Sequence, residues 1–197
     1  MLELFPEYPE ALENTFKIAE SVEVYDLNHK PYMPNFPLPE SFELLPDVSE
    51  AIKKINESGY LAIVVTNQPV IARGEVSYEE LELIHNKMET LLGYDGVYVD
   101  GIYYCPHHPH KGYEGEVPEL KTECECRKPK QGMLLRAAKD LNIDLSKSYM
   151  IGDGENDVKA GIAAGCKTVL ISDECDSFNQ NICVNSLKEF VDRYFEQ

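Results

Sequence analysis

From about residue 47 onward, segments with the apolar spacing of an amphipathic helix alternate with short apolar runs. Ala51, Ile52 and Ile55 form one face of a predicted helix that ends near Gly59. The unbroken apolar run 61–65 follows at once, as is typical of a strand buried on both faces. The chain therefore begins this region with a helix that leads into a strand.

The same alternation continues to the end of the chain. Ser77 and Glu80 have the spacing of a capping box, which predicts a helix whose inward face carries residues 81, 84, 88 and 91. Further strands are predicted at 101–104, 149–151 and 168–171, and further helices at 131–141, 156–164 and 187–195. This order predicts an α/β fold, a Rossmann-like parallel sheet flanked by helices, with ligands at the carboxyl ends of its strands.

The first part of the chain has a less regular pattern. Residues 9–19 fit a helix, Val22–Tyr25 alternates like a half-buried strand, and 31–39 contains four prolines and is predicted as a loop. A chain of 197 residues can bury one full core. We expect an N-terminal extension over 1–20 and a single domain over 21–197.

The net charge of the protein restricts which molecules it is expected to bind. A formal charge of −17 repels a nucleic-acid backbone, and no apolar stretch is long enough to cross a membrane. The acidic N-terminus does not resemble a secretory signal. We expect a cytoplasmic monomer that binds neither nucleic acid nor membrane, and whose small anionic substrate requires a local positive site.

Three of the six cysteines are clustered with histidines. Cys105 and His107 are followed, after a loop without apolar periodicity, by Cys124 and Cys126. Three thiolates and one imidazole are the tetrahedral ligands that zinc prefers in closed structural sites. The sequence predicts a zinc-bound loop over 105–126, with His107 favoured over His108 because alternate residues of an extended segment point the same way. The remaining cysteines, 166, 175 and 183, are interpreted as packing residues without chemistry.

Phosphate-handling side chains are predicted after strands or beside this loop. Thr66, Asn67 and Gln68 follow the buried strand and offer a hydroxyl, amides and free backbone N–H groups. Arg127 and Lys128 follow the last predicted zinc thiolate, where two cations can neutralise a phosphoryl group.

A carboxylate follows the strand at 149–151. Asp153 opens the next helix, where it can hold Mg²⁺, and Asp157 lies one turn later, where it can support that ion. An acid favoured by the helix dipole would look similar. The motifs occur along the chain in the order Thr66-Asn-Gln68, Lys128 and Gly152-Asp153. Together, in this order, they indicate a phosphate-binding site.

These motifs resemble the haloacid-dehalogenase (HAD) superfamily of phosphohydrolases. Within it they are most similar to D-glycero-D-manno-heptose 1,7-bisphosphate 7-phosphatases and histidinol-phosphate phosphatases. The resemblance runs from about residue 42 to 171 and rests on Val64-Val-Thr-Asn-Gln68, Ile71-Ala-Arg-Gly74, Gly101-Ile-Tyr-Tyr-Cys-Pro-His-His-Pro109, Cys124-Glu-Cys-Arg-Lys-Pro129, Gly132-Met-Leu-Leu135 and Gly152-Asp153.

The resemblance implies a role for each matching residue. It implies that Thr66 binds the phosphoryl group, that Asn67 and Gln68 bind substrate, and that Arg127 and Lys128 stabilise the transition state. It further implies that Asp153 ligates Mg²⁺ and that Gly154 lies near the substrate.

The first motif of the family, D-x-D-G-T on the first strand, has no counterpart here. A gapless count from Phe42 puts Val24 at the nucleophile and Asp26 at the general acid. A two-residue shift makes Asp26 the nucleophile and Mg²⁺ ligand, with Asn28 in place of the acid. Valine can neither attack phosphorus nor bind Mg²⁺, and losing only the general acid typically costs about 10²–10⁴-fold in rate.

Three hypotheses follow from the altered motif. The first is a Mg²⁺-dependent sugar phosphatase working through Asp26, most simply on heptose 1,7-bisphosphate. The second is a catalytically impaired relative that binds a phosphorylated ligand or a protein, or a phosphatase acting on histidinol phosphate. The third is that the N-terminal segment is altered, or foreign to the ancestral domain, so that activity was lost with it.

Overall fold

The computed structural model describes residues 42–175 and 178–195, all within the second of two units into which the chain divides, residues 36–197. Predictions for 1–41 therefore lie outside the described residues. They comprise the helix at 9–19, the strand at 22–25, the loop at 31–39, the boundary at residue 20 and the roles of Val24, Asp26 and Asn28.

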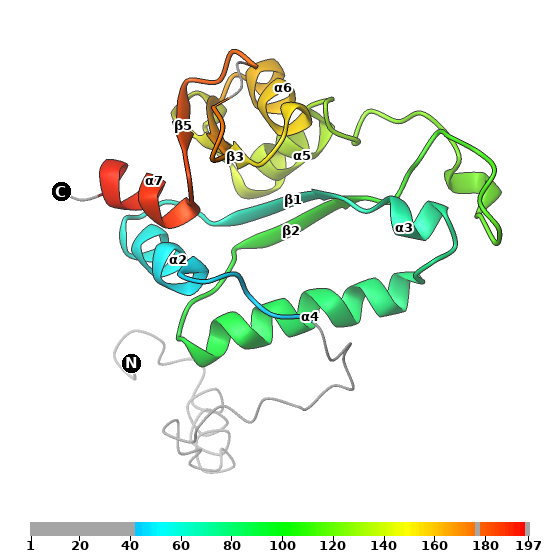
Figure 1. Cartoon of the computed structure of the whole chain (residues 1–197), viewed down its shortest axis with the longest axis horizontal. Helices are drawn as coiled ribbons and strands as arrows, with labels where there is room; N and C mark the ends of the chain where they lie inside the picture. Colours follow the sequence, from blue (N-terminus) through cyan, green and yellow to red (C-terminus); the bar gives the residue numbers. More distant parts are fainter. Residues whose placement is uncertain (1–41, 176–177, 196–197) are drawn as a thin grey trace, which may run out of the picture. The chain divides into compact units, whose positions relative to one another are not determined.

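Parallel strands alternate with helices, as the apolar pattern predicts (Figure 1). In chain order the elements are α2 (Val48–Glu57), β1 (Ile63–Asn67), α3 (Pro69–Ala72), α4 (Tyr78–Tyr94), β2 (Gly101–Cys105), the 3₁₀ turn η1 (Pro118–Leu120), α5 (Gly132–Leu141), η2 (Leu145–Lys147), β3 (Tyr149–Gly152), α6 (Glu155–Ala164), β4 (Lys167–Ile171), β5 (Ile182–Val184) and α7 (Leu187–Tyr194). The short elements α3, η1, η2 and β5 had no clear sequence signal.

The described strands form two parallel sheets rather than one. β1 pairs with β2 in the register Ile63 to Gly101, and β3–β4–β5 pair in that order, with Tyr149 opposite Lys167. Within residues 42–175 and 178–195, β1 and β3 are each paired along one edge only. The prediction of parallel strands flanked by helices is confirmed.

Local signals place the helix ends. The capping box that begins α4 is confirmed: Ser77 Oγ accepts from the Glu80 N–H at 3.1 Å, and Glu80 Oε2 accepts from the Ser77 N–H at 2.8 Å. Gly165 ends α6 with a left-handed φ of 82°, a conformation that costs glycine little. On α4 the fully buried side chains are Leu81 and Leu92, whereas Leu91 is only partly buried.

The core lies mainly between the helices and the β3–β4–β5 sheet. Val169 of β4, Ala51 of α2 and Phe190 of α7 belong to one cluster, and all three are fully buried. A second cluster joins Ile52 of α2 to Leu92 of α4. No helix among the described residues has the length and apolar content needed to cross a membrane.

Burial differs between the strands. Thr168, Val169 and Leu170 of β4 are at most 1% exposed, but all of β1 is only partly buried, and Leu61 before it is 47% exposed. The prediction that the run 61–65 is buried on both faces is therefore wrong for the described residues. The physical reason is that β4 has a strand on each side, whereas among the strands of residues 42–175 and 178–195 β1 has one only on the β2 side.

Two of the cysteines predicted to be inert are bonded to each other. Cys175 and Cys183 form a disulfide that links the segment after β4 to β5, with their Cα atoms 6.0 Å apart. The packing prediction is wrong for this pair, because the return of the chain at β5, which had no sequence signal, brings the two residues together. Cys166 is free and buried, as predicted.

Candidate active site and metal centre

The four predicted zinc ligands converge on one point. The sulfur atoms of Cys105, Cys124 and Cys126 lie 3.2–3.5 Å from one another, and His107 Nδ1 lies 3.4 Å from Cys126 Sγ and 3.6 Å from Cys105 Sγ. All four ligand atoms lie within 4.8 Å of one another. Because these distances fit a small tetrahedral ion, the cluster can hold zinc, and with four protein ligands such a site is structural.

The surroundings support the choice of ligands. His108 is buried outside the cluster, with Nδ1 3.3 Å from the His110 carbonyl oxygen, so His107 and not His108 lies with the three cysteines. Burial, together with hydrogen bonds to the neighbouring thiols, raises the pKa of Cys105 far above the ordinary thiol value. A dication that favours thiolates removes this penalty on ionisation, so metal binding and the folding of this loop are coupled.

The loop between β2 and α5 is also attached to the turn after α3. The Val117 N–H donates to the Ala72 carbonyl at 3.1 Å, and a Cβ on Gly74 would lie 1.9 Å from the Gly115 carbonyl oxygen. Only glycine permits this approach, and its φ of 73° also requires it. The Arg73 turn is thereby fixed against the zinc loop.

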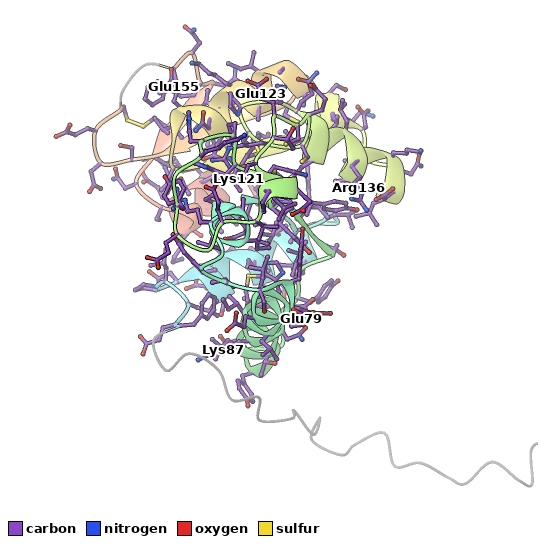
Figure 2. The ribbon with its side chains drawn as sticks, turned by 90° about the vertical axis from the view of Figure 1, so that its right-hand side faces the viewer. Glu79, Lys87, Lys121, Glu123, Arg136 and Glu155 are labelled. Carbon is purple, nitrogen blue, oxygen red and sulfur yellow. A yellow bond between two sulfur atoms is a disulfide. The ribbon has the colours of Figure 1, made fainter. Side chains whose placement is uncertain are left out.

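Aromatic and charged side chains pack inside the loop between β2 and α5. In Figure 2 this loop faces the viewer, and Lys121 is labelled in its middle. The Lys121 ammonium lies 4.6 Å from the centre of the Tyr113 ring and 3.3 Å from Glu116 Oε2, and its side chain is fully buried. The Arg73 guanidinium stacks on the same ring at 4.9 Å. Tyr113, Glu116 and Lys121 belong to no recognisable motif, and no role was predicted for them.

Lys128 connects the zinc loop to the carboxyl end of β1. Its backbone N–H donates to Asn67 Oδ1 at 3.0 Å, and its carbonyl accepts from Asn67 Nδ2 at 3.1 Å. Its ammonium donates to the Val65 carbonyl at 2.7 Å and lies 2.5 Å from Asp157 Oδ1 on α6. Both charged side chains are 12% exposed, so the cation is held in one position.

The other predicted residues of these segments make contacts of their own. Thr66 follows Val65 on β1, and its hydroxyl accepts from Gln68 Nε2 at 3.3 Å. Arg127 donates from Nη1 to the His107 carbonyl at 3.0 Å, so its guanidinium lies against the zinc loop. The structure thus attaches Arg127 to the metal centre and Lys128 to the ends of β1 and α6.

Asp153 lies in the turn between β3 and α6 and is exposed, whereas Asp157, in the first turn of α6, is buried. Its Oδ2 accepts from the Gly154 N–H at 3.3 Å while Oδ1 pairs with Lys128. A Cβ on Gly152 would lie 2.3 Å from the Asp157 carboxyl group, so this glycine allows the approach. The Asp157 carboxylate thus contacts both Lys128 and the Gly154 turn.

The site also differs from the prediction in its extent. The structure brings Asn67, Lys128 and Asp157 into one hydrogen-bonded group, which the Gly154 N–H joins through Asp157. Asp26, the predicted nucleophile, lies outside the described residues. Spacing alone gave no sign of the Lys128–Asp157 pair, since the two residues are on different elements.

Comparison with known proteins places this arrangement in a class. A profile of HAD-hydrolase-like proteins matches residues 125–179. A HAD-like phosphatase from Mesorhizobium loti superposes with a TM-score of 0.68 at 32% identity, over 78% of this chain and 73% of that chain. The D,D-heptose 1,7-bisphosphate phosphatase of B. bronchiseptica, crystallised with magnesium and phosphate, gives 0.63 at 28% identity, over 76% and 82%. The fold and site are those of a HAD-like hydrolase.

Proteins similar in sequence show which family of HAD-like hydrolases is involved. The D-glycero-beta-D-manno-heptose-1,7-bisphosphate 7-phosphatase of Haemophilus ducreyi is 44% identical over 133 residues, which cover 67% of this chain and 70% of that protein. The Escherichia coli enzyme of the same name is 41% identical over 132 residues, 67% of each chain. The chain belongs to the D-glycero-beta-D-manno-heptose-1,7-bisphosphate 7-phosphatase family of HAD-like hydrolases.

Proposed function

We propose that this protein hydrolyses the 7-phosphate of D-glycero-D-manno-heptose 1,7-bisphosphate with magnesium as cofactor. The names of its relatives support this proposal. The observation that carries it is the position of Lys128, whose ammonium is fixed between the Val65 carbonyl and Asp157 beside the metal centre. A chain with a formal charge of −17 has placed a fixed cation at the strand ends, where a phosphate needs one.

Each described residue has a proposed part in binding. The Thr66 hydroxyl and the Lys128 ammonium contact the transferring phosphoryl group, while Arg127 neutralises charge that develops on it. The amides of Asn67 and Gln68 contact the substrate, and Gly154 leaves room for it because it has no side chain. The hydrogen bonds between Asn67 and the Lys128 backbone hold this set in place before substrate arrives.

Asp26 and Asp153 are the proposed magnesium ligands, and Asp26 is also the proposed nucleophile. Asp153 is free to ligate because Asp157, and not Asp153, is paired with Lys128. Bound magnesium would supply charge neutralisation at the phosphoryl oxygens. The carboxyl oxygens of Asp26 and Asp153 suit this ion, which prefers oxygen ligands.

Phosphate release from heptose 1,7-bisphosphate with magnesium tests the proposal. We expect turnover by the parent protein, loss of it in Asp26→Ala, and a fall of roughly 10²-fold or more in Lys128→Met, which removes a charge that stabilises the transition state. Lys130→Met is the matched control, because Lys130 pairs with exposed Glu125 and should leave the rate unchanged. No release at high enzyme concentration would refute the proposal, and a rate unchanged by Asp26→Ala would remove Asp26 as nucleophile.

A second candidate is a phosphate-binding relative without turnover. It is favoured by Val24, which occupies the nucleophile position in the gapless count. Calorimetric binding of heptose bisphosphate that depends on Lys128, without phosphate release, would identify it. Histidinol phosphate, assayed in parallel, tests the alternative substrate of the subgroup.

The proposed setting is a monomer in the cytoplasm, without nucleic-acid or membrane partners. The acidic composition supports this setting, because it disfavours contact with nucleic acid and with anionic membrane surfaces. Sedimentation of the purified chain at several concentrations tests the monomer.

A further inference from the structure

The connection between β4 and β5 is short for two parallel strands. The link of ten residues, 172–181, carries the chain from the end of β4 back to the start of β5, and its described residues contain no helix. Parallel neighbours usually need a crossover of a dozen or more residues, most often a helix. Because no helix holds this link, the Cys175–Cys183 disulfide, which closes it covalently, has a defined place in the fold.

The link is also attached to β4 by contacts that do not involve sulfur. The Thr168 N–H donates to Asn181 Oδ1 at 2.8 Å, and the Asn181 N–H donates to the Thr168 carbonyl at 3.0 Å. At the other end of β4, the Ser172 N–H donates to the Val184 carbonyl at 2.9 Å. Val184 is 3% exposed and packs in the same core cluster as Val169. We therefore expect β5 to stay paired with β4 when the disulfide opens.

The two cysteines differ in their access to solvent. Cys175 is exposed and lies in the irregular link, whereas Cys183 is half-buried in β5. Cys183 Sγ lies 3.9 Å from the Ser172 carbonyl oxygen, which can accept a hydrogen bond from the thiol once the disulfide is reduced. An external thiolate can therefore reach Cys175 from solvent, and the sulfur that leaves has a partner inside the protein.

We propose that Cys175 and Cys183 form a thiol–disulfide exchange site that opens and closes in the folded protein, with a small thiol, RSH, as its reactant. To open it, the thiolate RS⁻ attacks Cys175 Sγ, the S–S bond breaks, and Cys183 leaves as a thiolate that takes a proton from solvent. A second thiolate attacks the outer sulfur of the mixed disulfide, so that RSSR departs and Cys175 is protonated in turn. Two RSH are thereby oxidised to RSSR while the protein disulfide is reduced to two thiols, and the reverse reaction closes the link.

The position of the pair favours exchange over a permanent cross-link. Cys175 lies outside any helix or strand, and Cys183 lies in β5, which among residues 42–175 and 178–195 pairs only with β4. The sequence separation is only 8, and a short ring restricts the unfolded chain less than a long one. In the proposed cytoplasmic setting, disulfides are usually transient or redox-sensing. The pair therefore combines an accessible sulfur with a modest constraint on the chain.

Acidic side chains select the kind of thiol that reacts fastest. Asp173 and Glu174 directly precede Cys175, both are exposed, and the chain carries a formal charge of −17. This charge repels an anionic thiol such as glutathione and attracts a cationic one such as cysteamine. Because salt screens both effects, added salt should slow the reaction with cysteamine and speed that with glutathione. A change in the same direction for both thiols would overturn this charge selection.

Alkylation followed by peptide mass spectrometry on the full chain tests the exchange directly. Samples that start oxidised or reduced are held in glutathione mixtures until they agree, then quenched with acid and alkylated. We expect the Cys175–Cys183 pair to change from mostly disulfide at an oxidising ratio to mostly dithiol at the cytosolic ratio, with an unchanged circular dichroism spectrum. Cys166→Ser is the matched control, because Cys166 is free and buried and should leave the midpoint unchanged.

Two results of this experiment contradict the exchange site. A pair that stays bonded at the cytosolic ratio from both starting forms is a structural disulfide. A pair that never bonds at the oxidising ratio consists of two independent thiols. Either result would overturn the proposal.

Stability gives a second readout, which is independent of phosphatase activity. For so short a ring, reduction should raise the equilibrium constant of unfolding by roughly 10- to 100-fold. Cys175→Ser, at an exposed position, should match the reduced parent at every glutathione ratio. Cys183→Ser should give the same value, because its hydroxyl can still donate to the Ser172 carbonyl. Redox-dependent stability that persists in Cys175→Ser would assign the effect to another cysteine and overturn the role of this pair.

Discussion

The ammonium of Lys128 and the carboxylate of Asp157 lie 2.5 Å apart, each side chain 12% exposed. Lys128 lies two residues after Cys126 of the Cys/His cluster, and Asp157 lies in the first turn of α6, so this ion pair joins the loop that carries the cluster to the helix after β3. The other Asp157 oxygen accepts from the Gly154 N–H. Because few water molecules reach the pair, dissolved salt screens it only weakly. Its contribution to stability therefore depends mainly on its geometry.

Replacing Asp157 by Asn should be costly. The change leaves the Lys128 ammonium largely buried without its counter-charge, and breaking such pairs typically costs about 3 kcal/mol or more in the free energy of unfolding. Urea denaturation followed by circular dichroism measures this loss. The control Glu125→Gln removes an exposed partner of Lys130 and should change nothing measurable. Equal midpoints for both variants would contradict the structural role of the pair.

Zinc content should follow the four clustered ligands. The purified protein is expected to carry one zinc per chain, and Cys126→Ser to carry less than about half an equivalent, because a closed site loses affinity with any ligand. Loss of the ion should also expose the 106–123 loop to proteolysis. Elemental analysis and limited digestion provide the two readouts, with Cys166→Ser as the control that retains both metal and resistance. A parent protein without zinc after gentle purification would contradict the zinc-bound loop.

The backbone approach at Gly74 makes a second prediction about the same loop. Gly74→Ala introduces a Cβ at 1.9 Å from the Gly115 carbonyl in addition to the strain of a φ of 73°. Gly59→Ala is a matched control, since Gly59 has a φ of 79° but no atom within 4 Å of the point where a Cβ would lie. We expect the control to cost about 1 kcal/mol and Gly74→Ala to cost at least twice as much. Thermal or urea unfolding measures the loss of stability in each variant. Equal losses in the two variants would show that the close contact with Gly115 does not constrain residue 74.

Stability should fall in mild acid because of His85. Burial lowers its pKa, against the opposing effect of Glu89 and Glu82, and its Nε2 is buried without a hydrogen-bond partner among the described residues. Since the folded pKa lies below the unfolded value of about 6.5, the contribution is complete above that pH and is lost as pH falls below it. His85→Phe, which keeps a ring beside Tyr104, should lessen the pH dependence of the unfolding free energy between about pH 7.5 and 5.5. An unchanged dependence would show that His85 titrates alike in both states.

Much of the molecule follows from sequence alone. Apolar periodicity placed α2, α4, α5, α6, α7 and most of the strands, because each element must turn its apolar residues toward a core. The zinc ligands could be predicted for a similar reason, since the Cys-x-His and Cys-x-Cys pairs fix which donors can meet one ion. Family motifs likewise indicated Thr66 in β1, Lys128 in the segment before α5 and Asp153 after β3, because each motif is a local property of the chain.

Tertiary structure decided the rest. The Lys128–Asp157 pair, the Cys175–Cys183 disulfide and the stacking of Arg73 on Tyr113 each join segments that no local pattern connects. The division of the described strands into two sheets is also a tertiary result, because pairing depends on where the chain returns after β2. Sequence determines what each segment can bury and bind, but only the fold determines which partner it meets, since long-range contacts depend on how all segments pack at once.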